Sequence, residues 1–163
     1  MPRKLIKDKA IVEDSYTLVE SVDALPESGD ILIDIAIWAD AKAKLDGYNG
    51  NIGLRIVGET EPEDFADDMA SLALIAIEFP AFKDGRGYSL ARLLRERFGF
   101  TGELRATGDV LRDQLFFLMR CGFNSFAIRE DRDIEDALNG LSDFSVVYQA
   151  DANEKKPIYQ RRG

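Results

Sequence analysis

Charged and hydroxyl side chains able to bind or transform a small anion gather in two predicted loops. Asp84, Arg86 and Ser89 lie in PAFKDGRGYS, the segment that follows the apolar run LALIAIEF. Arg105 lies within the alternating segment GELRAT, and Asp109 follows that segment. A guanidinium and the free amides at a helix N-terminus both bind oxyanions, and a carboxylate can act as a general acid or base. This pattern predicts a site for a small oxyanion.

The residues of these loops divide into candidate catalysts and candidate anion ligands. We assign Asp84 and Asp109 as the acid–base candidates, and Arg86, Ser89 and Arg105 as the anion-binding candidates. The glycines of GRG give the backbone two flexible positions, and Ser89 stands where it can cap the helix SLARLLRERF. The same sequence is equally typical of an ordinary turn into a helix, so both interpretations stay open for this loop.

Arg105 has the most informative position among the candidates. Alternation along GELRAT puts Glu103 and Arg105 on one face of a strand and Leu104 on the other. A charged face on an interior strand needs partners. Arg105 either pairs with Glu103 in a structural network or points toward a ligand, with Asp84 or Asp109 orienting it. We favour the second alternative.

The other conspicuous side chains are interpreted first as structural. Trp38 and the pair Phe116 and Phe117 have the helical spacing of core residues. Cys121 lies at the end of an apolar helix, where a thiol behaves as a small buried hydrophobe and not as a nucleophile. The arginines of SLARLLRERF are expected on a solvated helix face: Arg92, Arg95 and Arg97.

Two residue types on which many enzymes depend are scarce. The chain contains a single cysteine and no histidine. An intrachain disulfide, a cysteine cluster and a histidine-activated nucleophile are therefore excluded, and we predict no metal site. KDGRGYSLA lacks the third glycine of the dinucleotide-binding pattern G-x-G-x-x-G, so the sequence identifies no cofactor.

Charge and hydropathy bear on partners and location. The formal net charge of −9 and the pI near 4.6 argue against binding to nucleic acid or to an anionic membrane surface. No run approaches the ~20 apolar residues that a membrane helix needs. The N-terminal MPRKLIKDKAIVED has no apolar signal region. Together with the single cysteine, these features predict a cytoplasmic protein.

Predicted strands and helices alternate along the chain. Strands are expected at 31–37, 51–57, 72–79, 102–107 and 124–128, and helices at 38–45, 61–72, 89–98, 109–121 and 133–141. About five β/α units predict an α/β fold with a mostly parallel sheet. The sheet is either an incomplete TIM-barrel-like arc, which we prefer, or an open doubly wound sheet.

A single domain is expected over residues 1–163. Residues 1–30 are predicted to form an irregular or short-strand N-terminal segment, 144–149 a last strand, and 150–163 a mobile charged tail. Asp109 is the predicted N-cap of the helix 109–121, and Gly122 its C-terminal stop.

The segment FPAFKDGRGYSLARLLRERFGFTGELRATGDVLRDQLFFLMRCGFNSFAI closely resembles the signature segment of a bacterial family known as domain of unknown function 934. The resemblance is strong from Ala73 to Ile128 and includes all the candidate site residues. Members of that family are typically encoded beside assimilatory sulfite reductase, and some carry the label oxidoreductase. The resemblance implies a role in sulfur assimilation.

Three functional hypotheses follow. The first is an accessory protein of assimilatory sulfite reduction that binds the reductase, its electron donor or the small oxyanion itself. The alternative is an enzyme acting on a small anionic substrate, with aspartates as acid–base groups and arginines as anion clamps. A purely structural interaction domain would instead have its arginines engaged in internal salt bridges.

Overall fold

The computed structural model describes residues 3–80 and 85–147, with side chains as far as residue 141. Its strands are β1 (Lys4–Lys7), β2 (Ala10–Glu13), β3 (Thr17–Val19), β4 (Ile31–Asp34), β5 (Ile52–Val57), β6 (Leu74–Phe79), β7 (Glu103–Gly108) and β8 (Ser125–Phe126). Its α-helices are α1 (Trp38–Lys42), α2 (Arg86–Glu96), α3 (Leu115–Cys121) and α4 (Ile134–Val147). Short 3-10 helices are η1 (Val22–Ala24), η2 (Ile35–Ile37), η3 (Pro62–Asp64), η4 (Ala66–Ser71) and η5 (Arg112–Gln114).

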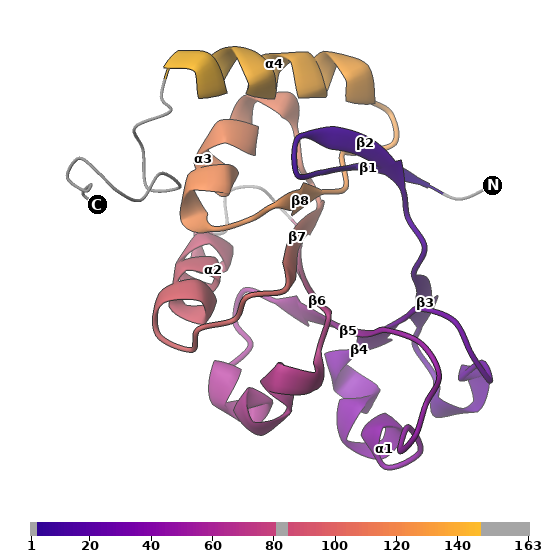
Figure 1. Ribbon diagram of the computed structural model, residues 1–163. Coiled ribbons are helices and arrows are strands. Elements are labelled where there is room, and N and C mark those ends of the chain that lie inside the picture. The colour runs from indigo at the N-terminus through magenta and orange to yellow at the C-terminus, as the bar shows by residue number, and fades with distance from the viewer. Residues whose placement is uncertain (1–2, 81–84, 148–163) are drawn as a thin grey trace.

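The strands form one eight-stranded sheet in the order β2-β1-β8-β7-β6-β5-β4-β3. β3 to β8 are parallel and neighbour one another in chain order, whereas β1 runs antiparallel to β8 and β2 antiparallel to β1. The sheet is therefore mixed, and it curls like half of a barrel (Figure 1). A doubly wound sheet requires a point at which the strand order reverses. The order from β3 to β8 has no such point, so the barrel-like arc is the correct alternative.

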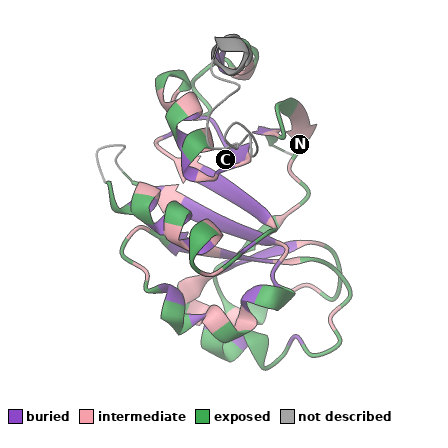
Figure 2. Ribbon diagram, turned by 60° about the vertical axis from the view of Figure 1, so that its left-hand side comes forward, coloured by how far each residue is buried: buried purple, intermediate pink, exposed green. Residues whose placement is uncertain are grey.

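The two faces of the sheet have different chemistry. On the face covered by helices, Ile75, Ile77 and Leu104 are fully buried in the main hydrophobic core. Figure 2 shows the buried strands behind helices whose outer surfaces are exposed. On the opposite face the register aligns one row across neighbouring strands, Asp34, Arg55, Ala76, Arg105 and Ser125, and three of these residues are charged. The alternation predicted for GELRAT is confirmed.

Local sequence explains the helices that border the candidate loops. In α2, Leu90, Ala91 and Leu94 are buried whereas Glu96 is exposed, as an amphipathic helix requires. Gly122 has a φ of 119° at the end of α3, and this left-handed conformation confirms it as the C-terminal stop.

Several element predictions need correction. The helix predicted over 61–72 is the two 3-10 segments η3 and η4, in a stretch rich in aspartate, which has a low helix propensity. The predicted last strand at 144–149 is wrong for residues 144–147, which continue α4. The short strands expected in the first 30 residues are present as β1, β2 and β3, which belong to the same sheet as the later strands. The expected tail 150–163 lies outside the described residues.

Two helix starts were also misplaced. α2 begins at Arg86 with Gly85 as its N-cap, so Ser89 is an exposed residue of the first turn and not a cap. α3 begins at Leu115, and Asp109 is not its N-cap. The Asp109 amide instead donates to the Phe79 carbonyl at 2.7 Å, which holds this residue against the end of β6.

Candidate functional site

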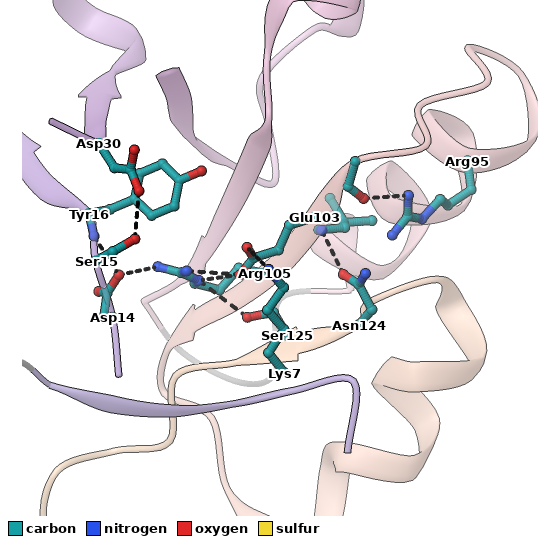
Figure 3. Close-up of polar contacts among 12 residues, drawn as sticks. Lys7, Asp14, Ser15, Tyr16, Asp30, Arg95, Glu103, Arg105, Asn124 and Ser125 are labelled. Carbon is teal, nitrogen blue, oxygen red and sulfur yellow. Dashed lines mark hydrogen bonds and ion pairs between the residues drawn. The ribbon is translucent and has the colours of Figure 1, made fainter. Parts of the chain in front are cut away.

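Arg105 lies at the centre of a buried polar network (Figure 3). The network is on the face of the sheet opposite the helices, which we call the inner face. The Arg105 side chain is only 4% exposed. Nη2 donates to Glu103 Oε2 at 2.8 Å, Nε to Ser125 Oγ at 3.3 Å, and Nη1 to Asp14 Oδ1 at 3.2 Å. The first of the two alternatives for Arg105, a structural network with Glu103, is therefore present, and it includes Asp14 from the segment between β2 and β3.

The network has further partners around a polar cavity of about 340 Å³. Lys7 Nζ lies 3.3 Å from Glu103 Oε1, and the Arg105 guanidinium lies over the Tyr16 ring at 5.5 Å from its centre. Asp30 also lines the cavity and immediately precedes β4, so the cavity lies toward the amino ends of the parallel strands. In barrel-like sheets the carboxyl ends carry ligands, and the amino ends contribute to stability.

The charges of this network shift two pKa values. Burial by itself raises the pKa of Glu103, but the Arg105 charge, a Ser125 hydrogen bond and Lys7 outweigh it, so that the pKa lies below its usual value. Burial and the neighbouring Glu103 carboxylate raise the pKa of Tyr16 to about 12. Glu103 therefore stays ionised and Tyr16 neutral near neutral pH.

The lowered pKa of Glu103 predicts a pH-dependent contribution to stability. Because the folded state holds this carboxylate ionised more strongly than the unfolded chain does, the contribution is complete above about pH 4.5 and is lost as the pH falls through the lower folded value. Urea denaturation of the wild type and Glu103→Gln should give a stability difference that is constant above this pH and shrinks below it. Glu96→Gln, at an exposed position, is the matched control. A difference independent of pH would contradict the assignment.

The carboxyl ends of the strands carry a second set of ion pairs. Asp109 Oδ1 lies 3.2 Å from Arg129 Nη1, and Arg129 Nη2 lies 2.8 Å from Asp131 Oδ2. Hydrogen bonds to both carboxylates raise the pKa of Arg129. Arg86 Nη1 lies 3.1 Å from Glu59 Oε2, in the loop after β5. This edge of the sheet, which we call the carboxyl rim, therefore holds paired and exposed charges.

The candidate residues consequently fall into separate places. Arg105 pairs with Glu103 and Asp14 in the inner-face network, whereas Asp109 pairs with Arg129 at the carboxyl rim. Arg86 lies at the carboxyl rim, and Ser89 is exposed one turn farther along α2. Asp84 lies outside the described residues. Convergence of the predicted catalytic and anion-binding groups on one pocket is not observed among those that are described.

A second inner-face ion pair was missed by the sequence interpretation. Arg55 of β5 pairs with Asp34 of β4 and with Glu20 Oε2, the latter at 2.9 Å. Hydrogen bonds to these carboxylates outweigh burial and raise the pKa of Arg55, and Arg55 in turn lowers the pKa of Asp34. The signal was available, because IGLRIV alternates in the same way as GELRAT.

Most side chains assigned to the core are confirmed there. Cys121 is buried, and burial raises the pKa of its thiol. Trp38 is buried, and its Nε1 donates to Asp68 Oδ2 at 2.9 Å. Phe117 is a correction, since 47% of it is exposed. Arg95, which was expected on a solvated helix face, is another correction, because it is half-buried and donates to backbone carbonyls.

The described residues also bear on metals and membranes. Within 3–80 and 85–147, no group of three or more metal-ligating side chains comes together. None of the helices in that part of the chain combines the length and the apolar character needed to cross a membrane.

Comparison with known families gives a match to the segment that carries the candidate residues. A search of curated proteins gave no match. A family model described as a bacterial protein of unknown function, DUF934, matches residues 53–159, which is well over half of the chain and includes β5 to α4. The chain therefore belongs to the bacterial DUF934 family.

Proposed function

We propose that this protein is a cytoplasmic accessory protein of assimilatory sulfite reduction, and that it works by binding sulfite reductase. The family resemblance described above implies that such proteins are encoded beside that enzyme. Genomic neighbourhood suggests a shared process and not a mechanism, so the proposal depends on a surface able to bind a protein.

The observation that carries the proposal is the exposed Phe117 on α3. Its ring packs edge-on against Tyr88 of α2, with ring centres 4.9 Å apart, and Tyr88 in turn lies 5.4 Å from the buried ring of Phe79. The exposed aromatic side chain is therefore held by a neighbour anchored in the core. Rigid aromatic groups of this kind lose little entropy on binding and are common energetic centres of protein interfaces.

The contacts of Arg105 favour a protein that binds a partner protein over one that binds an anion at Arg105. Its guanidinium is already engaged by Glu103 and Asp14, so binding an oxyanion there would require displacing a buried carboxylate. Removing one partner of a buried ion pair is costly. The anion-binding role first assigned to Arg105 therefore has little support, and a partner surface is the simpler proposal.

Replacing Phe117 with alanine tests the surface. We expect Phe117→Ala to weaken binding to sulfite reductase about 10–100-fold, because truncating an interface aromatic commonly costs 2 kcal/mol or more. Stability should change by about 1 kcal/mol or less, since the side chain is largely exposed. Co-purification and titration with the purified reductase measure the effect.

Leu18→Ala is the matched control, because Leu18 is another large apolar side chain with 43% exposure and lies on the edge strand β3. It should bind as the wild type does. Failure of the wild type to bind the reductase, together with normal growth of a deletion strain on sulfite, would overturn the proposal. Binding to the electron donor and not to the reductase would identify the electron donor as the partner of the same Phe117 surface.

One observation favours the alternative of an enzyme acting on a small anionic substrate. Asp109 and Arg129 meet at the carboxyl ends of β7 and β8, the edge where such sheets place ligands. In that alternative Asp109 is the acid–base group, and Arg86 and Arg129 hold the anion. A sulfite-consumption assay on this protein alone, on the reductase alone and on both together separates the two proposals.

A further inference from the structure

A second cavity, of about 430 Å³, lies between the C-terminal ends of α2 and α3, the turn from β1 to β2, β8 and the middle of α4. Five apolar or thiol side chains line it together with Arg95: Met119, Cys121, Phe123, Phe126 and Leu141. The volume is within the range of about 300–1,000 Å³ typical of small-molecule sites. The cavity is distinct from the polar cavity around Arg105 and from the carboxyl rim.

Arg95 differs from the other partly buried arginines in its partners. Its Nε donates to the Gly122 carbonyl at 2.9 Å, and its Nη1 donates at 2.9 Å to the carbonyls of Phe100 and Gly102 (Figure 3 shows its approach to the backbone). Within the described part of the chain, no carboxylate forms an ion pair with it. Burial lowers the pKa of Arg95, but an arginine remains charged at neutral pH.

Arg105 and Arg55 have the carboxylate partners that Arg95 lacks within the described residues. Each lies on the sheet with at least one carboxylate within 3.2 Å. Carbonyl dipoles satisfy the hydrogen-bonding geometry of Arg95 but leave its net charge uncompensated in a partly desolvated place. An anionic ligand would supply that charge, and Nη2 has no hydrogen-bond acceptor within the described residues.

We propose that this cavity binds a small organic carboxylate with an apolar body, whose carboxylate pairs with Arg95 and whose body contacts Met119, Phe123 and Leu141. The apolar walls favour such a ligand over an inorganic oxyanion, which would keep its hydration better in water. Lys9 and Arg120 also line the cavity and add positive charge, whereas Asp8 and Glu96 oppose it.

The experiment uses octanoate as the probe and octanamide as its neutral match. Octanoate should raise the melting temperature of the full chain, and it should slow modification of Cys121 by a neutral disulfide reagent about tenfold at saturation. Cys121 is a clean reporter, since it lines the cavity and is the chain's single cysteine. Octanamide at the same concentrations should have much less effect.

Two substitutions should shift octanoate affinity in opposite directions. Arg95→Lys keeps the charge but loses the planar fork, and it should weaken octanoate binding about tenfold. Arg97→Lys, on the exposed end of the same helix, is the matched control and should bind as the wild type does. Glu96→Gln removes a negative charge from the mouth and should tighten binding about twofold.

Equal protection by octanoate and octanamide, or protection by neither, would overturn the proposal. So would an unchanged affinity in a folded Arg95→Lys. If Arg95→Lys does not fold, because its contacts also join α2 to the Phe100–Gly102 loop, Glu96→Gln decides the question: tighter octanoate binding supports the site, and unchanged or weaker binding overturns it.

Discussion

Replacing Arg105 with methionine should lower the free energy of unfolding by about 3 kcal/mol or more, because it leaves the Glu103 carboxylate buried without its closest counter-ion. Glu103 is only 7% exposed, and Lys7 at 3.3 Å can offset only part of the loss, since its own side chain is 41% exposed. Asp14 and Ser125 would also lose their donor. Urea denaturation at neutral pH measures the change.

A double variant separates the buried charge from packing. Arg105→Met combined with Glu103→Gln removes both charges and should recover much of the lost stability, because the cost lies mainly in the unpaired carboxylate. Arg55→Met is the matched control on the same face, and it should cost less because the Arg55 and Asp34 side chains are each 21% exposed. A loss below about 1 kcal/mol in Arg105→Met would show that the network contributes little.

The same network changes the expectation for Arg105→Lys. If Arg105 were an anion ligand without a structural role, a lysine at this position would fold normally and fail in function. In the structure the planar guanidinium contacts Glu103, Asp14 and Ser125 at once, and a single ammonium cannot reproduce that geometry. We therefore expect loss of stability to accompany any loss of growth on sulfite.

The fold was largely predictable because two local rules determine it. Continuous apolar runs such as LALIAIEF belong to strands buried on both faces, and β6 has Ile75 and Ile77 on one face and Leu74 on the other, all fully buried. Alternation in GELRAT correctly separated charged from apolar faces. The arrangement of parallel strands in chain order then follows from successive β/α units.

The candidate site was less predictable because its geometry depends on contacts that are distant in sequence. Asp14 reaches Arg105 across 91 residues, and no periodic pattern indicates that approach. Arg95 has the sequence environment of a solvated arginine, yet the turn at Gly122 brings carbonyls to it. Phe117 fits a helical apolar pattern, but α3 is short and leaves that position outside the core.

Gly108 lies at the carboxyl end of β7, and Gly108→Ala should destabilise the fold by about 2–4 kcal/mol. Gly108 has a φ of 89°, which by itself costs an alanine about 1–2 kcal/mol. A β-carbon there would also press on the backbone of Phe79, 3.0 Å from its carbonyl carbon and 3.1 Å from its nitrogen. Neither atom can move without separating β6 from β7.

Gly47→Ala isolates the backbone term of this prediction, because Gly47 has a φ of 74° and nothing within 4 Å of the added carbon. It should cost about 1–2 kcal/mol, and the excess in Gly108→Ala measures the steric contact. Equal losses of stability in Gly108→Ala and Gly47→Ala, measured by urea denaturation, would mean that the ends of β6 and β7 move apart to make room for the added carbon. If the strand ends do move apart, the hydrogen bond from Asp109 to Phe79 must lengthen, and the Asp109–Arg129 pair at the carboxyl rim would be displaced with it.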